Sequence, residues 1–311
     1  MEDAFAVELR EQRGAVRERI GRVGCWSFAL EAQTAADEAR DVAEIEAMGY
    51  PAIWFPESVE SREVFSHASW LLASTERVVI ASGIANIWAR DAVAMTNGWH
   101  MLTDAYPDRF VLGMGVSHPR SVARRGSEYV RPYSRMREYL DAMDRAPSSA
   151  PEPEAVPHRM LAALGPRMLE LAAERSLGAH PYFVPVEHTA FARTRLGPEP
   201  VLAVEQTVVV ETAPAEARRI ARGFAAGYLS SPNYAGNLRR MGYTAEDVSG
   251  SGSDRVIDAV IAWGDVDRIA SRVREHLSAG ADHVCVQVIA AEDSDVCLAQ
   301  LRELAPAMFE L

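Results

Sequence analysis

The sequence of 311 residues contains no lysine, so all 32 of its basic residues are arginine. Without a lysine amine, the chain cannot form a Schiff base, attach pyridoxal phosphate or place a P-loop lysine on the phosphates of a nucleotide. It also lacks a G-x-S-x-G elbow, an H-E-x-x-H helix and a G-x-G-x-x-G turn after a strand. These absences weigh against hydrolases, zinc proteases and Rossmann dehydrogenases.

Cysteine is scarce, and acidic residues outnumber basic ones. Cys25, Cys285 and Cys297 lack C-x-x-C or Cys/His spacing, so we expect reduced core thiols and no metal site. The formal net charge of −12 argues against a nucleic-acid partner. No apolar run approaches the roughly 18 residues of a membrane span, and residues 1–20 lack a signal-peptide apolar region. We therefore expect a cytoplasmic protein without a membrane partner.

Short apolar runs alternate with segments of helical period, which is typical of consecutive βα units. Alternating strands and helices imply parallel pairing, and eight repeats favour a closed (β/α)8 TIM barrel of the α/β class over an open sheet. An open dinucleotide-binding sheet would also be expected to have a glycine-rich turn after its first strand, where residues 28–31 read FALE. The eight expected strands are 23–28, 52–56, 78–84, 110–116, 160–164, 179–184, 201–210 and 283–289.

We expect one domain over residues 1–311, with an N-terminal helical lead at 1–20 and a helical insertion at 212–264, between the seventh and eighth strands. Asp91 and Pro166 are good helix-start signals, and Gly49 is a good stop signal. The expected helices include 35–48, 92–105, 167–175, 214–229, 233–241, 254–263 and 266–279.

The active site of a barrel is built at the carboxyl ends of its strands, so the polar residues that follow each apolar run are candidates. These candidates are Trp26, Ser27, Glu57, Ser58, Asn86, Trp88, Arg90, Ser117, His118, Gly165, His180, Glu211, Ala291 and Glu292.

Several segments together resemble one known family. They are RVGCW at 22–26, IWFPE at 53–57, GIANIWAR at 83–90, YPDRFVLGMG at 106–115, LGPRM at 164–168, GAHPY at 178–182, WGD at 263–265 and AGADHV at 279–284. In this order they resemble the luciferase-like oxidoreductases over essentially the whole chain after about Gly21. The combination is most similar to the branch that uses coenzyme F420, an 8-hydroxy-5-deazaflavin.

The resemblance implies coenzyme F420 as the cofactor, with FMN as the alternative. In the family, the loop after the third strand often contains a non-proline cis peptide and backs the central ring, and backbone amides after the fifth and sixth strands bind the phosphate. A helix that starts at Pro166 also directs amides and a positive dipole end at an anion, and Arg167 can add a charge-assisted bond. The cofactor-binding candidates are Trp26, Ile84, Ala85, Asn86, Ile87, Gly115, Gly165, Pro166, Arg167, Gly178, Ala179 and His180.

Each of these segments also has an ordinary structural explanation. Residues 84–87 can be a plain strand end, and Gly165 and Gly178 can belong to a helix start and a C-cap. Some relatives have an acidic residue and a glycine after the fifth helix, whereas this chain has LGA at 177–179.

Glu57 and His118 fall where family members keep acid and base groups beside the ring, and they are the catalytic candidates. Alternatively, Glu57 binds only loop amides and His118 only cofactor hydroxyls. Some relatives have a histidine after the acidic residue of strand two, where this chain has Ser58, so their proton-handling scheme cannot be copied.

The remaining aromatic and basic residues allow two interpretations. Trp54 and Trp99 fit core patterns, whereas Trp26 and Trp88 lie near strand ends, where they can stack on a ring. The arginines after the fourth strand can bind an acidic ligand or form a solvated helix face. They are Arg120, Arg124 and Arg125.

The sequence thus predicts an oxidoreductase, acting as a homodimer, that transfers a hydride between coenzyme F420 and a small organic substrate. One alternative is an FMN-dependent monooxygenase of the same fold. Another is a non-catalytic flavin-binding relative, which requires a closed or blocked pocket. Neither the substrate nor the direction of transfer is visible in the sequence.

Overall fold

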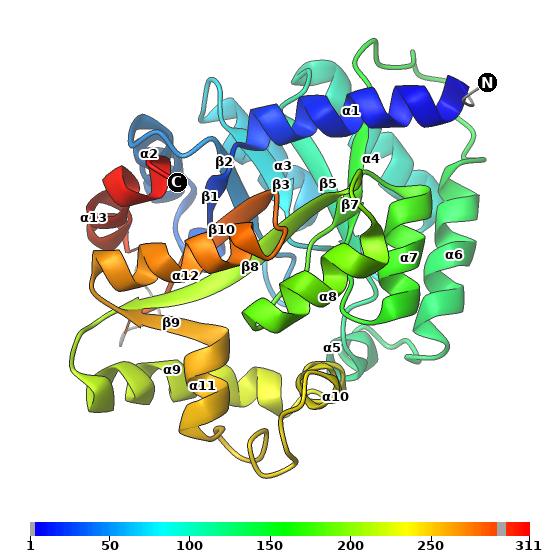
Figure 1. Cartoon of the computed structure of the whole chain (residues 1–311). Helices are drawn as coiled ribbons and strands as arrows, with labels where there is room; N and C mark the ends of the chain where they lie inside the picture. The colour runs from blue at the N-terminus through cyan, green and yellow to red at the C-terminus, as the bar shows by residue number, and fades with distance from the viewer. Residues whose placement is uncertain (1–3, 291–296) are drawn as a thin grey trace.

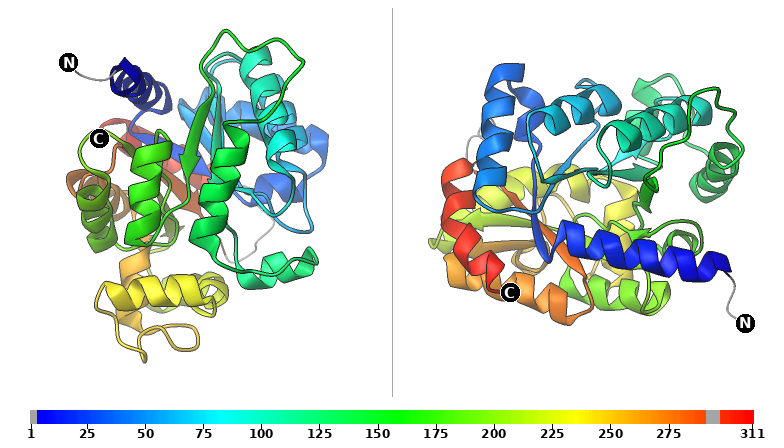
Figure 2. Two further views of the ribbon diagram at one scale, coloured as in Figure 1. Left: turned by 90° about the vertical axis from the view of Figure 1, so that its right-hand side faces the viewer. Right: turned by 90° about the horizontal axis from the view of Figure 1, so that it is seen from above.

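A computed structural model of the chain describes residues 4–290 and 297–311, so Ala291 and Glu292, expected after the last strand, lie outside the described residues. Its centre is a barrel of parallel strands, closed because the last barrel strand pairs with both the first strand and its predecessor (Figures 1 and 2). In order around the barrel, the strands are β1 (Val23–Trp26), β2 (Ala52–Phe55), β3 (Val79–Ser82), β5 (Phe110–Gly115), β6 (His158–Leu161), β7 (Gly178–Ala179), β8 (Val201–Val210) and β10 (His283–Val288). The predicted (β/α)8 barrel is confirmed, since each of the eight apolar runs overlaps one of its strands, although the run at 179–184 shares only Ala179 with β7.

The outer helices form a closed ring, because each one contacts the next and the last contacts the first (Figure 2). The ring consists of α2 (Ala35–Ala47), α3 (Val64–Ala73), α4 (Ala92–Ala105), α6 (Pro132–Met143), α7 (Pro166–Arg175), α8 (Val186–Leu196), α12 (Val266–Ser278) and α13 (Leu298–Phe309). Two short elements, the 3-10 helix η1 (Ala29–Ala32) and the helix α5 (Pro119–Arg124), follow β1 and β5. Within the described ranges, no helix is both long and apolar enough to cross a bilayer.

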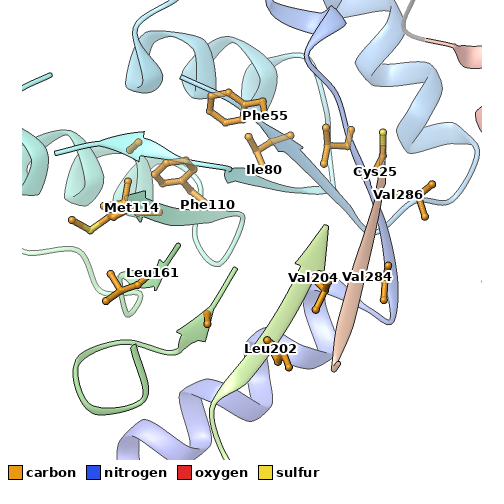
Figure 3. Close-up of a cluster of buried hydrophobic side chains, with 14 of the residues drawn as sticks. Cys25, Phe55, Ile80, Phe110, Met114, Leu161, Leu202, Val204, Val284 and Val286 are labelled. Carbon is orange, nitrogen blue, oxygen red and sulfur yellow. The ribbon is translucent and has the colours of Figure 1, made fainter. Parts of the chain in front are cut away.

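Side chains alternate between the two faces of the strands, as the two-residue period of a strand requires. Outward-facing residues, such as Cys25, Ile80, Leu202 and Val284, pack under the ring of helices (Figure 3). Their sequence neighbours fill the barrel interior, where Trp26 and Trp54 are 1% and 0% exposed. Both tryptophans therefore belong to the packed interior, and Trp54 has the core position expected of it.

Helix α1 (Ala4–Ile20) covers the amino-terminal end of the barrel, opposite the insertion (Figure 1). Val16 and Ile20 of this helix join the interior cluster from the amino-terminal end of the barrel. The Arg13 guanidinium is buried and donates hydrogen bonds to the backbone carbonyls of Ala173, Ser176 and Leu177, at or just after the end of α7. A cation at these carbonyls satisfies groups that a helix end leaves unpaired.

The insertion between β8 and α12 contains α9 (Pro214–Leu229), α10 (Pro232–Arg240), α11 (Asp254–Val260) and one strand, β9 (Ile261–Gly264). The helix expected over 254–263 is therefore correct over 254–260 and wrong only in its last three residues, which belong to β9. Residues Ile261–Gly264 are fully buried and pair with the outer end of β8, from Thr207 to Val210. β8 extends beyond its barrel neighbours, and the backbone groups of its last residues form hydrogen bonds with Ile261–Gly264. The helical periodicity of the sequence does not indicate this pairing. The predicted helix boundaries of 214–229 agree with α9.

Candidate functional site

A cavity of about 620 Å³ opens at the carboxyl ends of the barrel strands. Its wall is formed by residues at or just after the ends of β1, β2, β3, β5, β6 and β7, together with residues of α5, α6, α7, α9 and α10. Nine of the catalytic and cofactor-binding candidates line it: Trp26, Glu57, Ile84, Gly115, His118, Gly165, Pro166, Arg167 and His180. The strand-end candidates Ser58 and Ser117 line it as well. The strand-end rule therefore brings most of the candidates to one place.

Five other candidates do not line the cavity. Ala85 and Asn86 form the short strand β4 (Ala85–Asn86), which pairs with the end of β5, and Ile87 is 1% exposed within the core. Gly178 and Ala179 form β7, where a Cβ at Gly178 would lie 1.8 Å from the carbonyl oxygen of Val201. Close packing against β8 therefore explains the glycine at 178, which lies outside the cavity wall.

The segment after β3 turns sharply at a cis peptide bond between Gly83 and Ile84. This bond immediately precedes the stretch 84–87, where the resemblance placed such a bond. The Ile84 side chain lies against Gly115, because a Cβ at Gly115 would come within 2.6 Å of Ile84 Cδ1 and 3.2 Å of Ala162 Cβ. Glycine at 115 thus makes room for Ile84 on the cavity wall.

Glu57 forms a buried ion pair with Arg90. Arg90 Nη1 donates to Oε2 at 3.1 Å, and Nη2 donates to Oε1. The backbone N–H of Asn86 also donates to Oε2 at 2.7 Å. Both carboxylate oxygens are therefore engaged by the segment after β3, which agrees with the alternative that Glu57 binds loop amides.

His118 lies half-buried after β5, at the start of α5. Its Nδ1 lies 3.2 Å from Oδ1 of Asn233 in α10, and since an amide oxygen only accepts, Nδ1 carries the proton. Burial lowers the pKa of His118, and the hydrogen bond to Asn233 opposes this shift. In the neutral ring, Nε2 is free of this bond and can accept a proton.

The amino-terminal end of α7, which follows β6, forms another part of the cavity wall. Gly165 is its N-cap and Pro166 its first residue, and no side chain of the described residues caps the helix. The guanidinium of Arg167 stacks 4.1 Å from the ring centroid of Tyr133 and lines the cavity. The backbone N–H of Arg167, the helix dipole and the Arg167 guanidinium together favour an anion.

Residues of the insertion that the sequence left unassigned complete the wall: Tyr228 in α9, and Asn233 and Tyr234 in α10. The hydroxyl of Tyr182, which follows β7, donates to Gln287 Oε1 at 2.7 Å and lies 3.1 Å from the Tyr228 hydroxyl. The helical period located α9 and α10 but could not show which residues face the barrel. The available signal was the pair of aromatic residues on either side of the SSPN turn at 230–233.

The other aromatic and basic candidates divide as follows. Trp99 is 7% exposed in the core. Trp88 does not line the cavity, and its Nε1 donates to the backbone oxygen of Val116 at 2.9 Å. Of the three arginines after β5, Arg124 alone lines the cavity, and it pairs with Glu60. Trp26 is thus the one tryptophan of the described chain on the cavity wall.

These features define a class of protein: a (β/α)8 barrel whose strand ends surround a cavity that suits a cofactor with an anionic group. Comparison with known proteins then gives the family. The model of luciferase-like monooxygenases matches residues 22–283, so the chain belongs to the luciferase-like monooxygenase family. The predicted family membership and the prediction of an enzyme are confirmed.

Individual relatives lie at low sequence identity. The chain is 24% identical, over an alignment with a length of 348, to a protein of Mycobacterium tuberculosis described as a coenzyme F420-dependent oxidoreductase, covering 91% of this chain and 96% of the relative. The structure of a coenzyme F420-dependent tetrahydromethanopterin reductase from Methanopyrus kandleri has a TM-score of 0.74 at 16% identity, covering 93% and 100% of the two chains.

An FMN-binding protein shares the fold as well. A type II Baeyer–Villiger monooxygenase of Pseudomonas putida in complex with FMN has a TM-score of 0.65 at 15% identity, covering 92% of this chain and 98% of that one. At these identities the structural likenesses show the fold alone.

Proposed function

We propose that the chain is an oxidoreductase that uses coenzyme F420 and transfers a hydride between this deazaflavin and a small organic substrate. The observation that carries the proposal is one continuous cavity that joins the uncapped end of α7 to the interior of the barrel. A cofactor with an anionic tail and a flat ring needs both in a single space. The similarity to an F420-dependent relative over 91% of the chain supports the choice of cofactor.

The tail of the cofactor would be held at the start of α7. The backbone N–H of Arg167 and the positive end of the helix dipole attract a phosphate, and the guanidinium of Arg167 adds a second positive group. A Cβ at Gly165 would meet nothing within 4 Å, so the space beside this residue is open. The residues present therefore fit an anionic group.

The ring would lie deeper, where the wall is made of small and apolar residues. Gly83, Ile84, Gly115 and Ala162 line this part of the cavity. When bound, F420 supplies a ring carbon that gives or accepts a hydride. The protein has to orient the ring, exclude water and supply or accept the proton of the substrate.

His118 is the residue that we propose to hold or receive this proton. Its neutral ring offers Nε2, while Asn233 fixes the tautomer through Nδ1. Because Arg90 and the amide of Asn86 occupy both oxygens of Glu57, we propose that Glu57 positions the segment after β3.

FMN-dependent monooxygenation is the second candidate, and the FMN complex of the Pseudomonas putida protein supports it. Carbon replaces N5 in a deazaflavin, so F420 does not readily activate oxygen, whereas FMN does. A non-catalytic relative is disfavoured, because such a protein requires a blocked pocket and this cavity is open.

Titration of the purified protein with F420 and with FMN tests the proposal. We expect saturable fluorescence quenching at lower concentrations of F420 than of FMN, followed by hydride transfer within a panel of alcohols, ketones and activated alkenes. Tighter binding of FMN with oxygen-dependent turnover would replace the proposal by the monooxygenase. Tight F420 binding without any turnover would favour a non-catalytic role.

A further inference from the structure

One segment of the chain is strongly basic, although the protein as a whole is acidic. Residues 119–137, which run from the start of α5 into α6, contain six arginines and a single acidic residue, Glu128, whereas the whole chain has a net charge of −12. These arginines form the arginine belt, and all of them except Arg125 are exposed. The belt consists of Arg120, Arg124, Arg125, Arg131, Arg135 and Arg137. A positive surface on a negatively charged protein attracts a polyanion to one place.

The belt has few acidic partners within the protein. Many arginines elsewhere in the structure have them, and Arg175, for example, pairs with Asp141 and Asp144. Of the belt, only Arg124 forms an ion pair with a described residue, Glu60. These two side chains are 43% and 75% exposed, and an ion pair between exposed groups contributes little to stability. Arg124 can therefore exchange Glu60 for the carboxylate of a ligand at little cost.

The belt borders the cavity beside the proposed phosphate site. Arg124 lines the cavity, and Arg120 lies one turn earlier on the same face of α5. The ring centroid of Tyr133, another wall residue, lies 4.1 Å from Cζ of Arg167 and 6.0 Å from Cζ of Arg137. Figure 1 shows α5, α6 and α7 on one side of the barrel. A ligand that leaves the cavity past the start of α7 therefore meets the belt.

We propose that the arginine belt binds the oligoglutamate part of the F420 tail. This inference rests on the proposed function. Beyond its phosphate, the tail of F420 carries a chain of glutamates, each of which adds a carboxylate. A guanidinium matches a carboxylate in both charge and geometry, so a row of arginines suits a flexible row of carboxylates. FMN ends at its phosphate, so the belt also favours F420 over FMN.

An acidic substrate is the other ligand that arginines at the mouth of a cavity can attract. Of the six belt arginines, Arg124 alone lines the cavity. A small substrate held beside the ring, near Ile84 and His118, therefore reaches at most one of them. A tail that extends outward from the phosphate can reach several.

The test compares F420 without glutamates with the forms that carry two and six, by fluorescence titration of the whole protein. At low salt, we expect the wild type to bind the six-glutamate form roughly tenfold more tightly than the glutamate-free form, because each exposed ion pair contributes roughly a factor of two. At about 0.5 M NaCl this preference should nearly vanish, because salt screens exposed charges.

A variant of the belt tests which residues are responsible. Replacing three exposed arginines together, Arg120→Gln, Arg124→Gln and Arg137→Gln, should bring the affinity for the six-glutamate form close to that for the glutamate-free form. Glutamine keeps a polar side chain at each position while removing its charge, and exposed positions tolerate such changes without loss of the fold.

The matched control replaces three exposed arginines that do not line the cavity, Arg77→Gln, Arg274→Gln and Arg302→Gln. It changes the net charge of the protein by the same amount as the belt variant. We expect it to keep the preference of the wild type for the longer tail, because the attraction is local.

The outcomes separate this inference from the proposed function. Equal affinity of the wild type for all three forms at low salt would overturn the inference alone, since F420 would still bind. A preference that persists at high salt, or that the control variant loses as well, would show that the belt is not its cause. A belt variant that keeps the preference but raises the KM of an acidic substrate would assign the belt to the substrate instead. If no form of F420 binds the wild type, both proposals fail.

Discussion

Glu57 and Arg90 are joined in a buried ion pair, with side chains 2% and 10% exposed. The pair connects the residue after β2 to the segment that follows β4, and the amide of Asn86 adds a third contact to the same carboxylate. Removing one partner of a buried ion pair leaves the other partner unpaired, which is strongly destabilising. Glu57 therefore affects both the stability of the protein and the shape of the cavity wall.

We expect Glu57→Gln to lower the free energy of unfolding by about 1–3 kcal/mol, because the amide nitrogen faces the Arg90 guanidinium. Turnover should fall more than the affinity for F420. Urea denaturation and steady-state kinetics measure the two effects. Glu63→Gln is the control, since Glu63 also binds Arg90 but is 47% exposed, and it should change stability by less than about 1 kcal/mol. An equal loss of unfolding free energy in both variants would contradict the conclusion that burial makes the Glu57–Arg90 pair more important than the exposed Glu63–Arg90 pair.

Gly165→Leu should weaken F420 binding without unfolding the protein. The backbone at Gly165 has a φ of −88°, which any residue adopts, and the space beside it is open. A leucine side chain can therefore enter the proposed phosphate site without striking the protein. Gly223→Leu, in an exposed turn of α9 with similar free space, should bind F420 normally. If fluorescence titration shows that Gly165→Leu binds F420 with unchanged affinity, the phosphate does not bind beside Gly165.

His118→Ala should reduce turnover by about tenfold or more, while the affinity for F420 changes much less, because general acid–base groups act on the reacting proton. Asn233→Ala provides a finer test. The hydrogen bond to Asn233 raises the pKa of His118, so its loss should move the acidic limb of the pH–rate profile to lower pH. An identical pH profile in this variant, or single-turnover hydride transfer at the native rate in His118→Ala, would exclude His118 from proton transfer.

Glu205 should make stability depend on pH. Its side chain is 1% exposed inside the barrel, and burial raises its pKa from 4.5 to about 7, although hydrogen bonds from Thr207 and the amide of Phe183 oppose the shift. Since the folded state binds this proton more tightly than the unfolded state, its contribution to stability is present below pH 4.5 and is lost as the pH rises through 7.

The prediction is that Glu205→Gln gains stability relative to the wild type between pH 5 and pH 8, by on the order of 3 kcal/mol. Comparing the two proteins by urea denaturation at each pH cancels the titration of all other groups, including the buried histidines. Parallel stability curves across this range would show that Glu205 stays ionised in the folded protein.

The barrel was predictable because its signals are local. Each strand was visible as a short apolar run, and α4 and α9 were bounded correctly by their start signals and apolar periodicity. The strand β9 was missed because Ile261–Gly264 continues an apolar helical pattern, and the alternative hydrogen-bond partners belong to β8, about fifty residues earlier. A local pattern does not contain that information.

The same distinction applies to the site. The sequence alone contained the family motifs and excluded lysine chemistry. It also predicted that Glu57, His118 and Gly165, which follow barrel strands, lie at one end of the barrel. The tertiary structure decided which atoms are engaged: both oxygens of Glu57 by Arg90 and Asn86, and Nδ1 of His118 by Asn233. It also brought Trp26 and His180 together beside Gly83. Hydrogen-bond pairing and burial depend on residues far apart in the chain, so they exist only after the strands have closed into a barrel.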